Sequence, residues 1–266
     1  MSVQNFIPTI WSKKILTDLE LECKLVDNCW REYEGDATHA GSVKILGIGD
    51  VTIGDYTKAD INIQEVSDKG QLLTIDQAKY FAFVFDNVDK AQTVPGLLEG
   101  TRAEGIRGLA EARDAYVANL IKGGTNVTTA TALTNDAVKD AIDEALVELK
   151  ERNCNEEMTI ELTPAAAMKF LNSLTIKSTD NPEYIKKGVI GYYHGCKVIE
   201  SNGLAKDTTH AYCAIRAKKA IAFVGQLEKL EAMPMERRFG DLVKGLDVYG
   251  GKIIDNNRLQ VVKIPV

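Results

Sequence analysis

Residues 36–85 read DATHAGSVKILGIGDVTIGDYTKADINIQEVSDKGQLLTIDQAKYFAFVF, and this stretch decides the fold. Apolar and polar residues nearly alternate along most of it, which predicts β-strands. The apolar positions of the alternation are Val43, Ile45, Ile48, Val51, Ile53, Tyr56, Ile61, Ile63 and Val66. A two-stranded ribbon is at best marginally stable alone in water, so we expect it to lie against its own domain or another copy of the chain. The stretch therefore favours a protein that assembles.

A buried strand and a long helix are predicted directly after the ribbon. Residues 80–86 are rich in aromatic and β-branched side chains, which favours a strand within a buried sheet. Apolar residues then recur near helical spacing over 96–122, and two glycines at 123–124 supply a C-terminal stop. Glycines 100, 105 and 108 each cost this helix roughly 1 kcal/mol relative to alanine, so packing must compensate. The alternative is two shorter helices broken near Gly105.

A second region begins after the Thr- and Asn-rich linker 125–134. Thr134 suits the N-cap of a helix that ends by Asn153, and Thr163 with Pro164 opens another helix after a strand at 158–162. Further strands are predicted at 197–200, 211–215, 220–224 and 246–254. Helices and strands do not alternate as regular βαβ units, so the predicted fold class is α+β.

The composition limits the classes of partner. The 266 residues allow one large core or two smaller lobes, and 45% hydrophobic with 26% charged residues is typical of a globular protein. The net charge of −6 lacks the basic footprint of a dedicated nucleic-acid binder. Five scattered cysteines fit reduced thiols in a cytoplasm. No export signal and no long apolar run is evident, so we expect neither export nor a membrane span.

Motifs for chemistry are weak throughout the chain. Only three histidines are present, and His194 with Cys196 makes a pair too small for a zinc site. The glycine-rich stretch at 47–54 lacks the Gly-Lys-Ser/Thr of a phosphate loop. Glu156, Glu157 and Glu161 could form a catalytic carboxylate set, although a solvated strand edge explains them better. The sequence therefore predicts no catalytic, cofactor or metal site, and no enzyme.

Taken in order, the segments resemble the major capsid proteins of tailed double-stranded DNA bacteriophages, the Hong Kong 97-like fold. The matching segments are AGSVKI at 40–45, IGDY at 53–56, LTID at 73–76, the stretch 80–89, Gln92 ahead of the helix, GYYHGCKVIESN at 191–202, and 237–249. Each motif is loose by itself, but their order extends over nearly the whole chain. The resemblance implies an N-terminal arm at 1–34 and an extended β-hairpin loop at 36–72. It also implies a peripheral domain at 73–125 and 235–266 with a spine helix at about 96–122, and an axial domain at 126–234.

The resemblance also implies a function. Such subunits self-assemble as pentamers and hexamers into an icosahedral shell that encloses double-stranded DNA without sequence-specific binding. Each subunit lays its ribbon over a neighbour's spine helix and peripheral sheet. The implied partners are further copies of the chain, a separately encoded scaffolding protein, a portal and a decoration protein, with no membrane. The implied location is the virion capsid, assembled in the cytoplasm of the bacterial host.

Charged residues on the spine helix and the ribbon are candidates for ion pairs between subunits. The helix candidates are Glu99, Arg102, Glu104, Arg107, Glu111 and Arg113. The ribbon candidates are Lys44, Asp50, Asp55, Lys58 and Asp60, and Arg237 and Arg238 are added from the return strands. A solvated helix face is the alternative for each of the helix residues.

Two other functions remain open from the sequence. An encapsulin-like nanocompartment shares the fold and the shell but encloses enzymes. A cytoplasmic α+β enzyme that uses residues 156–161 or His194 is the second alternative, and it leaves the ribbon without an explanation.

Overall fold

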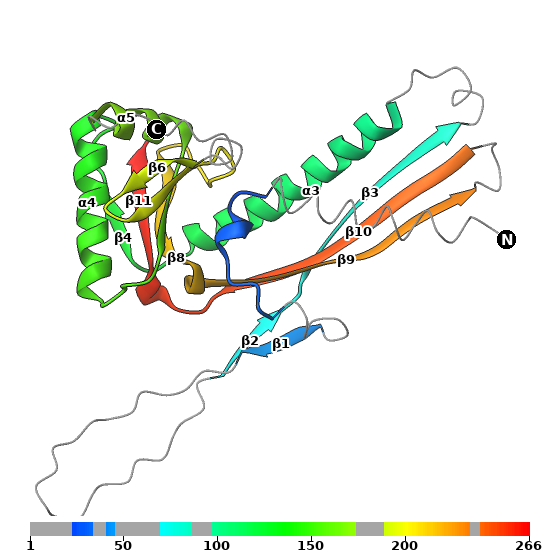
Figure 1. Ribbon diagram of the computed structural model, residues 1–266, viewed down its shortest axis with the longest axis horizontal. Helices are drawn as coiled ribbons and strands as arrows, with labels where there is room; N and C mark the ends of the chain where they lie inside the picture. The colour runs from blue at the N-terminus through cyan, green and yellow to red at the C-terminus, as the bar shows by residue number, and fades with distance from the viewer. Residues whose placement is uncertain (1–22, 34–40, 46–69, 87–96, 174–188, 235–239) are drawn as a thin grey trace, which may run out of the picture.

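The computed structural model describes residues 23–33, 41–45, 70–86, 97–173, 189–234 and 240–266. These residues form a six-stranded domain at one end, from which a long helix and three long strands project as an arm (Figure 1). A short hairpin lies beside the base of the arm. The mixed helix and sheet content agrees with the α+β class predicted from the sequence.

The six-stranded sheet is mixed, with the order β4-β11-β8-β5-β7-β6. Its strands are β4 (Val127–Thr129), β5 (Met158–Leu162), β6 (Val189–Tyr193), β7 (Cys196–Glu200), β8 (His210–Ala217) and β11 (Leu259–Pro265). Two pairs, β11 with β4 and β5 with β7, are parallel. The other three pairs are antiparallel.

Helices cover one face of this sheet. Thr134 caps α4 (Asn135–Glu151), accepting a hydrogen bond from the Ala137 amide, and α5 (Pro164–Ser173) follows β5. Apolar side chains of both helices and of the sheet form a single buried cluster, which includes Val138, Ile142, Leu149, Ile160, Leu162, Phe170 and Ile215. The predicted helix start at Thr134, the strand at 158–162 and the helix opened by Pro164 are confirmed.

The arm combines α3 (Leu97–Lys122) with an antiparallel sheet of order β3-β10-β9. Its strands are β3 (Gln77–Asp86), β9 (Ile221–Pro234) and β10 (Gly240–Ile253). α3 is one continuous helix across Gly105, so the alternative of two shorter helices is wrong. A Cβ at Gly105 would lie 3.6 Å from the ring of Phe81, which shows how closely the helix lies on β3.

The hairpin of β1 (Ser42–Ile45) and β2 (Gln71–Thr74) is the described part of the predicted ribbon. Val43, Ile45 and Leu73 are buried against Ala222 and Val224 of β9, so its apolar face is covered within the same chain. The ribbon residues 46–69 lie outside the described residues.

Several strands differ from the sequence-based expectation. β9 and β10 extend well beyond the predicted 220–224 and 246–254, because they pair with each other along the arm. β11 was not predicted, and it lies between β4 and β8 in the six-stranded sheet. The resemblance assigned 235–266 to the peripheral domain and 126–234 to the axial domain. In the structure, β11 from the first range pairs within the six-stranded sheet, and β9 from the second range pairs with β10 in the arm.

Candidate functional site

The residues considered for catalysis are not brought together. His194 (φ 47°) and Gly195 (φ 84°) form the tight turn between β6 and β7, where positive φ at both positions is typical of a two-residue hairpin. Cys196 is buried at the start of β7. Among the described residues, no three His, Cys, Asp or Glu side chains are grouped so that they could hold a metal ion.

The three carboxylates at 156–161 also have separate roles. Glu161 is fully buried and bonded to Arg216. Glu156 binds Arg258 and lies 3.8 Å from Lys219 Nζ. Glu161 therefore does not lie on the solvated strand edge expected from the sequence, and its role is separate from that of Glu156.

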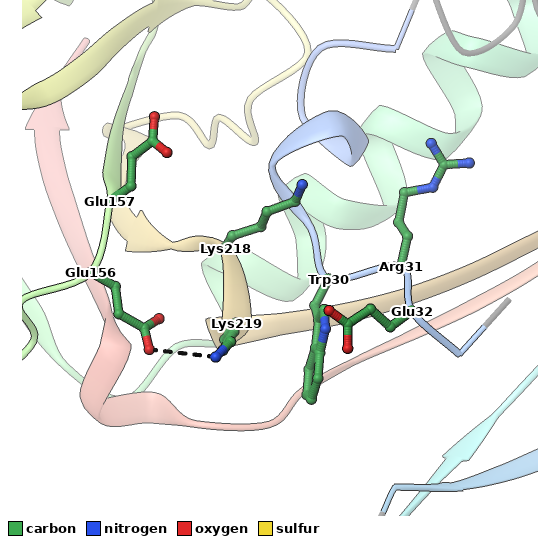
Figure 2. A pocket seen from close by; sticks show the side chains of 7 residues that line it. All are labelled: Trp30, Arg31, Glu32, Glu156, Glu157, Lys218 and Lys219. Carbon is green, nitrogen blue, oxygen red and sulfur yellow. Dashed lines mark ion pairs between the residues drawn. The ribbon is translucent and has the colours of Figure 1, made fainter.

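A pocket of about 400 Å³ opens beside Glu156 (Figure 2). Its lining consists of Trp30, Arg31, Glu32, Glu156, Glu157, Lys218 and Lys219. Three basic and three acidic side chains thus surround it, so it carries no net charge that would select an anion or a cation. The dashed line in Figure 2 marks the ion pair of Lys219 with Glu156.

Several of the predicted contact residues lie on the exposed side of α3. Arg107 Nη2 donates to Glu104 Oε1 at 2.6 Å, and Arg107 Nη1 lies 3.9 Å from Glu111 Oε1. Glu99 and Arg102 lie on the same helix, and Lys44 is exposed on β1. The remaining candidates, Asp50, Asp55, Lys58, Asp60, Arg237 and Arg238, lie outside the described residues.

Arg113 is located differently from that expectation. Its side chain is buried and donates to both carboxylate oxygens of Asp247 on β10. The guanidinium therefore stabilises the contact of α3 with its own sheet, and it is not available to a neighbour's ribbon. A charge pattern on a helix cannot show which charge points inward when its partner is distant in sequence.

The three-stranded sheet has one covered and one exposed face. Phe81 of β3 lies against α3, whereas Tyr80 is 77% exposed because successive side chains of a strand point to opposite faces. The register places five apolar residues on the exposed side, which we call the open sheet face: Tyr80, Val84, Met233, Leu242 and Leu246. The prediction that residues 80–86 belong to a buried sheet is therefore wrong for this side of β3.

Comparisons with known proteins bear on this arrangement. No protein-family model matches the chain, and no curated protein matches it. A solved capsid structure of the cyanophage P-SCSP1u has a similar fold, with a TM-score of 0.66 at 14% identity, covering 85% of this chain and 84% of that one. A solved structure of Mycobacterium phage Che8 is 30% identical, with a TM-score of 0.73 over 90% of both chains. The chain belongs to the Hong Kong 97-like major capsid proteins of tailed bacteriophages.

This identification confirms the family and the fold class expected from the sequence. The protein is a major capsid protein, a structural component of the virion shell. A virus-like particle from Pyrococcus furiosus shares the fold at 13% identity, with a TM-score of 0.59 over 98% of this chain and 100% of that one. In the part of the capsid protein that the structure describes, no helix has the length and apolar character needed to span a membrane.

Two groups of residues in this capsid protein could not be recognised from the sequence alone. The open sheet face was missed because the alternation on β3 is apolar on both sides, so the sequence does not show which side stays exposed. Asp114 and Asp247 were missed because each binds groups about 90 to 134 residues away along the chain. The available sequence signal for the first group was the run of six apolar or aromatic residues at 80–85.

Proposed function

We propose that this capsid protein assembles as pentamers and hexamers into a closed icosahedral shell that encloses the double-stranded DNA genome of a tailed phage. The open sheet face is the observation that carries the proposal. Tyr80 is 77%, Val84 48% and Met233 47% exposed, and the strand register places them on one face of the three-stranded sheet. The same face also carries the exposed Lys244 between Leu242 and Leu246, and exposed apolar side chains gathered on one face are typical of a protein interface.

The occupant we propose for this face is a second copy of the chain. Apolar surface contributes roughly 25 cal/mol per Å² when it is removed from water, and a shell removes the same surface from every subunit. β3 is also an edge strand of its sheet, so its outer backbone groups have no strand partner among the described residues. A neighbour that covers the face would therefore protect both the side chains and the edge.

The finer organisation of the subunit follows from the same proposal. Glu104, Arg107 and Glu111 on the exposed side of α3, together with Lys44, supply charges for ion pairs with neighbouring subunits. We place the N-terminal arm at 1–34, the extended loop at 36–72, and a peripheral domain around α3 and the three-stranded sheet. The axial domain contains the six-stranded sheet, including β11.

The shell requires binding partners but no catalysis. A scaffolding protein, a portal and a decoration protein are the proposed partners, and assembly takes place in the cytoplasm of the host. The net charge of −6 suits a container, because a wall that holds DNA weakly allows it to be packed and released.

A nanocompartment that encloses enzymes is the second candidate. The similarity to the Pyrococcus furiosus virus-like particle covers almost all of both chains, but at 13% identity it concerns the fold alone. The two candidates differ in what the shell contains, which is nucleic acid in one case and protein in the other.

Electron microscopy of the chain expressed in bacteria, with and without its neighbouring genes, tests the proposal. We expect closed particles or rosettes of five and six subunits. The variant Tyr80→Asp with Val84→Asp places charge on the open sheet face and should leave folded subunits that do not close into shells, whereas Tyr80→Phe should assemble normally. A small uniform oligomer in every wild-type sample would overturn the proposal. Normal shells from the double variant would show that the open sheet face is not an interface between subunits.

A further inference from the structure

A short N-terminal segment lies between the arm and the six-stranded sheet. This segment, Cys23–Trp30, is called the strap here, and it includes the 3-10 helix η2 (Val26–Asn28). Figure 1 shows it in dark blue, between α3 and the six-stranded domain. Leu25 and Cys29 have no exposed surface, and they belong to a buried cluster that also contains residues of α3, β8, β9, β10 and β11.

The arm holds the strap through one carboxylate. Asp114 of α3 accepts hydrogen bonds from three successive backbone amides, those of Lys24, Leu25 and Val26, at 2.9, 3.1 and 3.2 Å. These amides lie at the N-terminal end of η2, where backbone N–H groups have no hydrogen-bond partner within the helix. Asp114 therefore fixes both the position and the direction of the strap on α3.

The six-stranded sheet holds the same segment through a buried ion pair. Arg216 of β8 donates to the carbonyl oxygens of Leu25 and Asn28 at 2.7 and 2.6 Å. Its partner Glu161 of β5 binds Arg216 at 2.7 and 3.1 Å and accepts a hydrogen bond from Asn28 Nδ2 at 3.2 Å. Neither charged side chain has any exposed surface.

A third contact joins the strap to the base of β9. The Trp30 amide donates to the Ile221 carbonyl at 2.9 Å, and the Phe223 amide donates to the Trp30 carbonyl at 3.0 Å. The strap thus contacts α3, the six-stranded sheet and the three-stranded sheet at the same time.

The chain otherwise crosses between the arm and the six-stranded domain in short connections. α3 leads to β4 through a glycine pair at 123–124, β8 leads to β9 through η4 (Lys218–Ala220), and β10 leads to β11 through η5 (Asn256–Arg258). Apolar contacts between the arm and the six-stranded domain are non-directional, so they resist separation of the two parts more than rotation of one against the other. The hydrogen bonds of the strap are directional, and they end on both bodies.

We propose that Asp114 and the Arg216–Glu161 pair are positioning residues that fix, through the strap, the angle between the arm and the six-stranded domain and thereby the curvature of the shell. A rotation of the arm would stretch either the bonds to Asp114 or those to Arg216, because both sets hold the same few residues. The proposal rests on the proposed assembly into closed shells.

The bonds of Asp114 and of the Arg216–Glu161 pair to the strap are together called the clamp. The test removes the Arg216–Glu161 side of the clamp without leaving a buried charge. In the double variant Glu161→Leu with Arg216→Met, apolar side chains replace the pair, a change that is often neutral for stability. The matched control is Arg113→Met with Asp247→Leu, which removes another buried pair that joins α3 to β10 within the arm. Asp114→Ala removes the bonds between α3 and the strap. If the double variant does not fold, this single variant provides the test of the proposal.

Two readouts are taken, hydrogen exchange on unassembled subunits and the diameter distribution of assembled particles by electron microscopy. For the clamp variants we expect the strap amides to exchange about tenfold faster than in the wild type. We also expect broken or irregular particles in place of one uniform size, while the control keeps wild-type exchange at the strap and wild-type particles.

Uniform wild-type particles from a variant with a released strap would overturn the inference. Unchanged exchange at the strap amides would overturn it too, and so would equally irregular particles from the control. If the wild type itself forms no closed particles, the proposed function fails, and the exchange measurement still decides whether the clamp holds the strap.

Discussion

Arg113 of α3 and Asp247 of β10 form an ion pair inside the arm, where Arg113 Nε donates to Asp247 Oδ2 at 2.8 Å and Nη2 donates to Oδ1. Arg113 is 1% exposed and Asp247 has no exposed surface. The guanidinium also lies 5.9 and 6.0 Å from the ring centres of Phe223 and Tyr249. The pair therefore joins the helix to the middle strand of its sheet, with aromatic rings excluding water around it.

Arg113→Met leaves Asp247 as an unpaired buried charge. We expect the free energy of unfolding to fall by about 3–5 kcal/mol, measured by urea denaturation of the unassembled subunit. Arg107→Met on the same helix removes an exposed pair and should change stability by less than about 1 kcal/mol. Equal effects of the two substitutions would contradict the role assigned to burial.

The Asp114 carboxylate makes stability depend on pH. Burial raises the pKa of Asp114 from 3.8 to about 6, although its three backbone hydrogen bonds act in the opposite direction. The folded chain thus binds this proton more tightly than the unfolded chain. Its contribution to stability is complete below the unfolded pKa and is lost as the pH rises through about 6.

Asp114→Asn should remove this dependence. Relative to the variant, we expect the wild type to lose up to about 3 kcal/mol of unfolding free energy between pH values of about 4 and 8. Urea denaturation at a series of pH values measures the difference. Parallel stability curves for the two proteins would show that Asp114 does not titrate in this range.

Glycine is required at position 250 for a steric reason. A Cβ there would collide with the carbonyl oxygen of Thr74 and would lie 2.8 Å from Ile75 Cα, and backbone atoms cannot move aside as a side chain can. We expect Gly250→Ala to lower the free energy of unfolding by about 1–3 kcal/mol and to loosen β2 from β10. Hydrogen exchange at β2 and urea denaturation measure the two effects.

Gly108→Ala is the matched control for that change. A Cβ at this exposed position of α3 meets no atom within 4 Å. Alanine should therefore stabilise the helix by about 0.5–1 kcal/mol. A loss of stability at both positions would mean that glycine is needed for its backbone conformation at each site, and not because a Cβ lacks space.

The five cysteines should not react in the folded subunit. All are free and buried, and burial raises the pKa of Cys23 to about 12 and that of Cys213 to about 11. Thiolate is the reactive form, so we expect Ellman's reagent at neutral pH to modify none of them until denaturant is added. Rapid modification of one or more thiols in the native protein would contradict the packing around them.

Local signals in the sequence were sufficient for elements that are defined by their own residues. The glycine pair at 123–124 ended α3 at the expected place, and Thr134 and Pro164 marked the starts of α4 and α5. The lengths of β9 and β10 were not predicted, because their partners are distant strands and not near neighbours in the chain. β11 was missed although its residues are apolar, since nothing local showed that it enters another sheet.

The candidate site was predicted less completely than the fold. Exposed charges on α3 were recognised, yet Arg113 among them is buried by a partner 134 residues away. The strap falls within the N-terminal arm expected at 1–34, but the bonds that hold it depend on Asp114, Glu161 and Arg216, which only the tertiary fold brings together. Side chains that act between distant segments carry no periodic signal.

The position of β11 has a consequence for biosynthesis. Leu259–Pro265 lies between β4 and β8, strands whose residues leave the ribosome earlier. Until those residues emerge, the position between β4 and β8 is empty, and β4 has no strand of this sheet with which to pair. Translation must therefore pass Pro265 before the domain can close, so that prematurely terminated products cannot adopt the native sheet and take a place in the wall.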